Sequence, residues 1–190
     1  MGKEIDLLRD YPKSKRDITK RLVEKDEKIR TIARRFGKEF FDGDRKYGYG
    51  GFNYNPKYWQ PVIPTLKKNY SLNRNSKILD IGCAKGFLLV DLIKAIPGIS
   101  VTGIDISQYA INNCHPDISQ SVSVGDARFL PYEDSSFDLV LSINTLHNLE
   151  INELSKALKE IERVSSKNSF ITVDAYRNAM EKISMESWNL

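Results

Sequence analysis

The stretch Ile78-Leu79-Asp80-Ile81-Gly82-Cys83-Ala84-Lys85-Gly86-Phe87 decides the fold of this 190-residue chain. The apolar run Lys77–Ile81 predicts a buried strand, and the spacing of apolar residues in Gly86–Ile96 predicts a helix. A turn that leads straight from strand to helix brings its backbone close to a ligand, and glycine leaves that backbone bare. The first N–H groups of the helix point to the same place and favour an anionic group. The stretch therefore predicts a ligand-binding turn.

The sequence that follows repeats this alternation of strand and helix patterns. Helices are predicted at Gln108–Cys114 and Asn152–Ser165, and strands at Ile99–Ile104, Ser121–Val124, Phe137–Ile143 and Ser169–Ala175. The alternation is typical of the α/β class, with a doubly wound parallel sheet of about five strands that helices cover on both faces. Ligands of such sheets bind beyond the carboxyl ends of the strands, which is where the chemistry is expected.

The N-terminal part has a different character, so we expect an extension over residues 1–75 and a ligand-binding domain over 76–190. Asp17–Arg35 predicts a helix, whereas glycines and aromatic residues are interleaved in Phe40–Tyr58 and favour a loop. Such a loop either packs on the edge of the core as a simple lid or lines the ligand cleft. The candidates for lining the cleft are Tyr47, Tyr49 and Tyr58.

Composition narrows the class of protein. With 41% hydrophobic and 28% charged residues, the chain has the balance of a globular domain. No run approaches the ~18 apolar residues of a membrane span, and the first residues lack the apolar core of a signal peptide. The two cysteines, Cys83 and Cys114, have no metal-binding spacing. We therefore expect a reduced cytoplasmic protein with no membrane partner and no metal.

The net charge of +4 is concentrated near the N-terminus, where residues 1–46 hold 15 Lys/Arg and 10 Asp/Glu. A basic arm could touch a nucleic acid, but here the charges alternate in sign, as on a solvated helix face. We do not expect nucleic-acid binding.

Polar residues follow the later strands at the edge where a ligand would bind. Asp105 ends the second strand, 23 residues after Gly82, where a carboxylate can accept both hydroxyls of a ribose. The alternative is a charge at a helix N-terminus, although Ser107 is the better cap for the helix that follows. Asp126 ends the third strand, and His147 follows the fourth.

Three of these landmarks together resemble the class I, Rossmann-like S-adenosylmethionine-dependent methyltransferases. They are ILDIGCAKGF (78–87), VTGIDIS (101–107) and SVGDARFLPYEDSSFDLVLS (123–142). The resemblance implies S-adenosyl-L-methionine as cofactor, with the glycine turn against its methionine part, Asp105 on the ribose, and Ile106 and Asp126 at the adenine. The full implied cofactor set is Asp80, Gly82, Cys83, Ala84, Gly86, Asp105, Ile106, Asp126, Ala127 and Asn144. Ala84 departs from the family, which more often has glycine there.

The resemblance implies a methyltransferase, and we expect it to act on a small molecule or metabolite. The donor is already activated, so the protein mainly positions and desolvates the reactants. His147 is the candidate general base, because its ordinary pKa suits proton transfer near neutrality. The alternative for His147 is a packing role. Cys83 is expected to fill space rather than act as a nucleophile.

Two other functions remain open. The first is a domain that binds the cofactor without turnover. The second is a nicotinamide-dependent oxidoreductase, which is disfavoured because a dinucleotide fingerprint needs glycines at the first, third and sixth positions. This turn has glycines at 82 and 86 only.

The family resemblance also implies two further strands after the fifth, one of them antiparallel. Only 15 residues follow Ala175 (190 − 175), too few for two strands and their connections, and Tyr176–Met185 predicts a helix. We therefore expect no C-terminal hairpin, a possible truncation, and a fifth strand left as an edge made apolar by Phe170, Ile171 and Val173. An uncovered apolar edge favours pairing with another chain, so we expect either a cover from the N-terminal segment or a homodimer.

Overall fold

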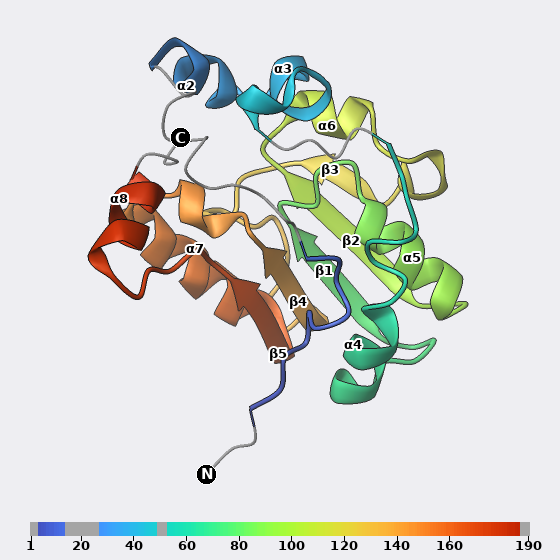
Figure 1. Cartoon of the computed structure of the whole chain (residues 1–190). Coiled ribbons are helices and arrows are strands. Elements are labelled where there is room, and N and C mark those ends of the chain that lie inside the picture. The colour runs from blue at the N-terminus through green and yellow to red at the C-terminus, as the bar shows by residue number, and fades with distance from the viewer. Residues whose placement is uncertain (1–3, 14–26, 49–52, 187–190) are drawn as a thin grey trace.

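A five-stranded sheet forms the centre of the protein (Figure 1). The computed structural model describes residues 4–13, 27–48 and 53–186. The strands lie in the order β3-β2-β1-β4-β5, and every neighbouring pair is parallel. They are β1 (Lys77–Ile81), β2 (Ser100–Asp105), β3 (Val122–Val124), β4 (Phe137–Ile143) and β5 (Ser165–Thr172). The predicted doubly wound parallel sheet is confirmed.

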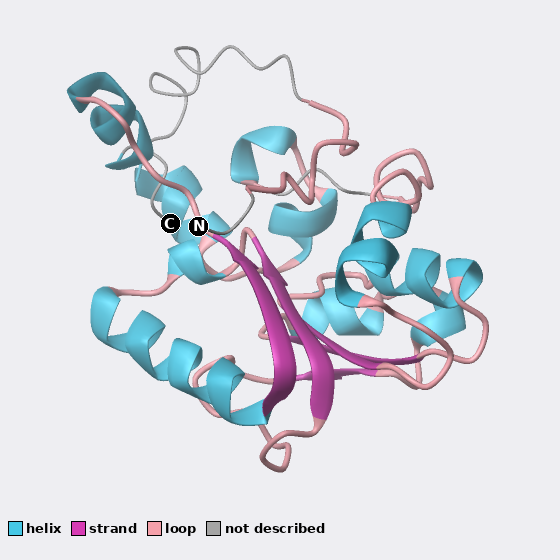
Figure 2. Cartoon of the chain, turned by 90° about the horizontal axis from the view of Figure 1, so that it is seen from below, coloured by secondary structure: helices cyan, strands magenta, loops and turns pink. Residues whose placement is uncertain are grey.

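Helices cover both faces of this sheet, as the view from below shows (Figure 2). The long helix α7 (Ile151–Val164) covers one face, and α4 (Ile63–Tyr70) and α5 (Phe87–Ala95) cover the other. The remaining helices are α2 (Glu27–Ala33), α3 (Lys38–Asp42), α6 (Gln108–Asn112) and α8 (Ala179–Glu186), with short 3-10 turns η1 (Arg45–Tyr47), η2 (Pro116–Ile118) and η3 (Leu146–Asn148). Within the described ranges, no helix is long and apolar enough to cross a bilayer.

The core is divided between the two faces by the alternation of side chains along each strand. On β1, Ile78 points into the cluster formed with α4 and α5, whereas Leu79 points into the cluster formed with α7. On β4, Leu139 and Val140 divide in the same way. Strands buried on both faces need continuous apolar runs, which explains why the sequence pattern located β1 and β4 at their exact bounds.

The N-terminal segment adds a layer to the α4–α5 face. Leu7 is buried there, and Leu8 and Tyr11 pack against the same cluster as Phe170 of β5. In Figure 1 this segment, drawn in dark blue, passes across β4 and β5. Further along the chain, α2 overlaps the predicted helix Asp17–Arg35 but ends at Ala33, two residues earlier than predicted, and the part of that prediction before Glu27 lies outside the described residues.

The fifth strand differs from its prediction: it begins at Ser165 rather than at Ser169. Helix α7 passes directly into β5 without a loop, and the polar start of the strand is held by the Ser166 hydroxyl, which donates to the Phe137 carbonyl over 2.9 Å. Phe170 and Ile171 pack on opposite faces of the sheet rather than along its edge, which corrects the expected apolar edge.

Within the described part of the chain, β5 pairs only with β4, so the predicted edge position is confirmed. Between β5 and residue 186 there is a helix, α8, and no strand, as expected. Dimerisation through this edge stays a prediction, and light scattering would measure it.

Candidate functional site

The turn between β1 and α5 adopts an alternating left-handed backbone. The φ angles are +77° at Gly82, +52° at Ala84 and +75° at Gly86. A Cβ on Gly82 would lie 2.1 Å from Thr145 Oγ1, so only glycine fits. The Gly82 and Cys83 N–H groups donate to the Ile104 carbonyl over 2.7 and 3.2 Å, which ties the turn to the end of β2.

Asp105 fixes the turn from the other side. Its two carboxylate oxygens accept from the Ala84 and Ser107 N–H groups, each over 2.8 Å. Ser107 caps α6, because its hydroxyl accepts from the Ala110 N–H, which confirms the predicted cap. Burial raises the pKa of Asp105 despite these two bonds. Asp105 is therefore a rigidly placed carboxylate whose remaining lone pairs face the end of the sheet.

Asp80 is a second buried carboxylate at this edge, with 5% of its surface exposed. Burial, and then the nearby charge of Asp105, raise its pKa from 3.8 to about 7. Within the described part of the chain its carboxylate has no hydrogen-bond or ion-pair partner. A buried acid of this kind is costly unless a positive group pairs with it.

The carboxylate of Asp126 is engaged by Arg128, a residue that the sequence analysis missed. The Arg128 guanidinium donates to both Asp126 oxygens over 2.5–2.9 Å and also pairs with Glu153 near the start of α7. The hydrogen bonds from Arg128 lower the pKa of Asp126. The position of Arg128 two residues after a strand-end acid was the available signal.

These groups line one cavity of about 490 Å³ at the carboxyl edge of the sheet. Of the residues that the resemblance implies, all except Gly86 line it, and Ile106 is 54% exposed there. The described wall from the sheet domain includes Asp80, Gly82, Cys83, Ala84, Asp105, Ile106, Asp126, Ala127, Arg128, Asn144 and Glu153. The N-terminal extension adds Leu8, Tyr11, Phe36, Phe40, Phe41 and Trp59.

Helix α3 is anchored over the turn by polar contacts at both of its ends. Asp42 accepts from the buried Lys85 ammonium at 2.5 Å and from the Tyr109 hydroxyl at 2.7 Å. Burial acts to raise the pKa of Asp42, but these hydrogen bonds outweigh it and lower the pKa. The Ser107 hydroxyl donates to the Phe36 carbonyl over 2.5 Å. Phe41 is then buried against Ala84.

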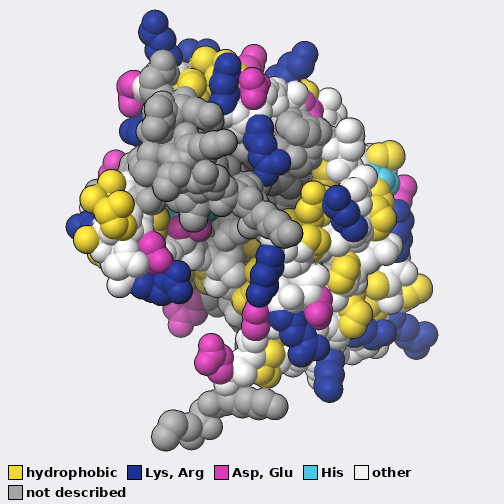
Figure 3. All heavy atoms as spheres, viewed as in Figure 1, with side chains coloured by type: hydrophobic (Ala, Val, Ile, Leu, Met, Phe, Trp, Pro, Cys, Tyr) yellow, Lys and Arg dark blue, Asp and Glu magenta, His cyan; other side chains and the backbone are white. Residues whose placement is uncertain are grey.

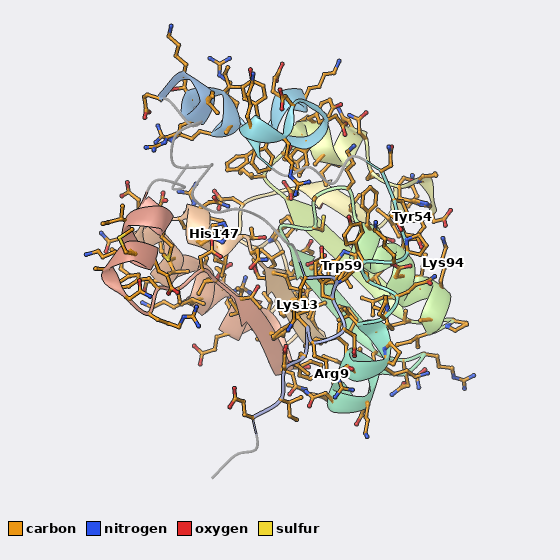
Figure 4. The ribbon with its side chains drawn as sticks, in the orientation of Figure 1. Arg9, Lys13, Tyr54, Trp59, Lys94 and His147 are labelled. Atoms are coloured by element: carbon orange, nitrogen blue, oxygen red, sulfur yellow. The ribbon has the colours of Figure 1, made fainter. Side chains whose placement is uncertain are left out.

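Two of the three tyrosines predicted to line the cleft do not line this cavity. Tyr47 lies in η1 and Tyr58 packs against Tyr11, and neither lines the cavity. Tyr49 lies outside the described residues. Trp59, labelled in Figure 4, lines the cavity directly after that segment, and Phe40 and Phe41 line it from the start of the segment. The glycine-rich segment therefore contributes to the cavity wall, but Tyr47 and Tyr58 are not the residues that do so.

His147 lies beside the cavity wall rather than in it. Its Nδ1 is buried without a hydrogen bond and lies 3.8 Å from Asp174 Oδ2. Asn144 has a left-handed φ of +54°, and its carboxamide oxygen accepts from the Thr172 hydroxyl. Burial raises the pKa of Cys83 far above its usual value, which disfavours a nucleophilic thiolate.

Comparison with known proteins decides the family. A family model described as a methyltransferase domain matches residues 79–173, half of the chain. The chain belongs to this family. Its cofactor is therefore S-adenosylmethionine, and its fold is that of the class I methyltransferases.

The relatives differ in what their names say they act on. The chain is 37% identical over 87 residues to mitochondrial arginine-hydroxylase NDUFAF5 of Mus musculus. This match covers 45% of this chain and 24% of that protein. It is 35% identical over 128 residues to tRNA (carboxymethyluridine(34)-5-O)-methyltransferase of Arabidopsis thaliana, covering 67% of this chain and 30% of that protein. The chain thus spans about a quarter to a third of these relatives.

The fold also matches solved structures. The PH0226 protein of Pyrococcus horikoshii OT3 is 26% identical, with a TM-score of 0.55. The match covers 73% of this chain and 64% of that one.

Proposed function

We propose that this protein transfers a methyl group from S-adenosylmethionine to a small molecule in the cavity at the carboxyl edge of the sheet. One observation carries the proposal: the bare Gly82 turn, Asp80 and Asp105 line the same cavity, which is of ligand size. When bound, the cofactor would supply a methyl group already activated on a sulfonium.

The residues present fit this cofactor. Asp105 keeps lone pairs that can accept both ribose hydroxyls, since each oxygen receives only one backbone N–H. The unpaired carboxylate of Asp80 suits the cofactor's ammonium group. Because Arg128 engages both oxygens of Asp126, we assign adenine contact to the backbone near Ala127 as well as to that carboxylate, and to the exposed side chain of Ile106.

The chain's own residues would then act by placement. The Gly82 backbone would hold the methionine part, and Asn144 at the end of β4 would stand where the acceptor approaches. His147 stays a candidate base that a small movement would have to bring to the acceptor. Turnover of His147→Asn, measured against pH with cofactor binding as control, tests that role: a base predicts a large loss, packing a small one.

A cavity with walls on two sides supports a small acceptor. One wall comes from the sheet domain and the other from the N-terminal extension, whose helix α3 is anchored over the turn. One relative described above is a tRNA methyltransferase by name, so a macromolecular acceptor is the competing expectation.

Two measurements test the proposal. Calorimetric titration with S-adenosylhomocysteine and with NADH should show binding of the first only. Incubation with methyl-labelled donor and a panel of small acceptors should then transfer label. Binding without transfer to any acceptor would favour the alternative of a cofactor-binding domain without turnover.

A further inference from the structure

We propose that the acceptor is an amine with an apolar, preferably aromatic, body, held against Tyr11 and Trp59. This inference rests on the proposed function and names its class of substrate.

The cavity wall is acidic although the chain is basic. Its described lining residues include four carboxylates, those of Asp80, Asp105, Asp126 and Glu153, against one guanidinium, that of Arg128. With all of them ionised, the wall has an excess of three negative charges. The cofactor has two positive groups and one carboxylate, so it neutralises only part of this excess. The remaining field favours a cationic or neutral acceptor and opposes a carboxylate or phosphate.

Cations are plentiful outside the cavity, which makes their scarcity inside it informative. Residues 53–79 contain Lys57, Lys67, Lys68, Arg74 and Lys77 and no acidic residue. Lys and Arg side chains are spread over the face shown in Figure 3. Among the described lining residues, however, there is no lysine and no histidine. Arg128, the cation among the described lining residues, already pairs with Asp126 and Glu153, so it is not available to an anionic acceptor.

Two aromatic rings line the cavity on the side of the N-terminal extension. The rings of Tyr11 and Trp59 lie 4.8 Å apart at 56°, and both line the cavity. They belong to the packed cluster that also holds Leu88 and Ile143, which fixes their positions. Ring faces attract both an apolar body and an ammonium group, and tryptophan does so most strongly.

Methyl transfer to an amine balances with water as the proton acceptor. The ammonium that the wall binds first loses one proton to water, and the nitrogen lone pair of the resulting neutral amine attacks the methyl carbon, so the C–N bond forms as the C–S bond breaks with its electron pair left on sulfur. Positive charge moves from sulfur to nitrogen, and the product is a methylated ammonium. An acidic, aromatic wall stabilises this charge at both ends of the transfer. This agrees with a histidine that lies beside the wall.

Three probes with the same apolar body test the inference in the full chain saturated with S-adenosylhomocysteine. They are phenethylamine, phenethyl alcohol and 3-phenylpropanoate, titrated by calorimetry. We expect the amine to bind at least about tenfold more tightly than the carboxylate, and more tightly than the alcohol. Trp59→Leu should weaken amine binding by about fivefold, whereas Trp59→Phe should retain most of it.

Controls separate this inference from the proposed function. Affinity for S-adenosylhomocysteine should be unchanged in both Trp59 variants, which also shows that they are folded. Tyr176→Leu removes an exposed ring outside the cavity and should change nothing. Equal or weaker binding of the amine, or unchanged amine binding in Trp59→Leu, would overturn the inference alone. Failure of the wild-type chain to bind S-adenosylhomocysteine would overturn the proposed function with it.

Discussion

One wall of the cavity comes from the ends of β1, β2 and β4 and presents carboxylates and bare backbone, while the other comes from residues before 60 and presents aromatic rings. The first wall is fixed by backbone hydrogen bonds, such as those from Gly82 and Ala84. The second is fixed by side chains, through Asp42 and through ring packing. The comparison separates two tasks: the sheet wall suits a common cofactor, and the aromatic wall is free to vary with the acceptor.

Gly82→Val should have the largest effect, because it breaks the sheet wall. The new side chain would have to adopt a left-handed φ of +77° and would meet Thr145. We expect no measurable binding of S-adenosylhomocysteine, a loss of at least about a hundredfold. Gly98→Val is the matched control, since Gly98 also has a positive φ, +89°, but lies outside the cavity. It should lower stability and leave cofactor affinity intact; equal losses in both variants would mean that the first only unfolds the chain.

Asp105→Ala should come next, with at least about a tenfold weaker affinity for S-adenosylhomocysteine. Two charge-assisted hydrogen bonds to the ribose would be lost, at about 1.5–3 kcal/mol each before relaxation. Asp138→Ala is the control, because Asp138 accepts from the Lys77 N–H at the opposite edge of the sheet. A folded Asp105→Ala chain with wild-type affinity would remove Asp105 from the site.

The pH dependence of cofactor binding should be a smaller effect and should come from Asp80. Its pKa is about 7, and its ionised form is the one that suits the cofactor's ammonium, so affinity should rise several-fold as pH increases through about 7. Stability of the free chain should move the other way. The folded chain binds the Asp80 proton more tightly than the unfolded chain does. The stability that this proton adds to the fold is therefore complete below about pH 4 and is lost as pH rises to about 7.

Asp80→Asn should flatten both pH profiles. Titrations with S-adenosylhomocysteine and thermal unfolding, each across this pH range, measure them. Asp126→Asn is the control, because the pKa of Asp126 is lowered and its carboxylate stays ionised across this pH range. A steep profile that survives in Asp80→Asn would assign the proton to another group.

Asp42→Asn should disturb the aromatic wall while sparing the sheet wall. It removes the carboxylate that faces the buried Lys85, at a cost of about 2 kcal/mol once the partial exposure of Asp42 is allowed for. Affinity for S-adenosylhomocysteine should change by less than about twofold because the sheet wall is intact, whereas amine binding should weaken by roughly two- to fivefold as α3 loosens. Tyr109→Phe, which removes only a neutral donor, should lower stability in urea unfolding by less than Asp42→Asn does. Equal effects of the two would show that the charge on Asp42 is unimportant.

The sheet wall could be read from the sequence because its positions follow rules of local structure. Apolar runs gave β1 and β4, and the residues after them had to lie at one edge of a parallel sheet. The prediction failed at the start of β5, where Ser165, Ser166 and Lys167 are polar. An edge strand pairs on one side only, so it tolerates such residues, and the apolar pattern began too late to locate it.

The aromatic wall could not be read in the same way. Phe36, Phe40 and Phe41 reach the cavity because Asp42 and Phe36 bond to the sheet domain, at Lys85 and Ser107. These contacts join residues about 40 to 70 positions apart, and no local pattern predicts them. Leu8 and Tyr11 likewise pack on Trp59 and β5 only in the folded chain.

Ala84→Gly should have the smallest effect, and it tests a residue of the sheet wall that packs against the aromatic wall. The Ala84 N–H donates to Asp105, and its side chain packs against Phe41 of α3. Relief of the left-handed strain at φ +52° is worth about 1–2 kcal/mol, against about 0.5–1 kcal/mol for the added backbone freedom and about 0.8 kcal/mol for the lost buried methyl. These nearly cancel, so unfolding free energy should change by less than about 1 kcal/mol and affinity for S-adenosylhomocysteine by less than about twofold. Ala84→Val, with a branched side chain at the same φ, should be clearly destabilised and serves as the contrast. If Ala84→Gly keeps its stability but loses cofactor affinity, the methyl contact with Phe41 is part of the cofactor site, and the aromatic wall then binds cofactor as well as acceptor.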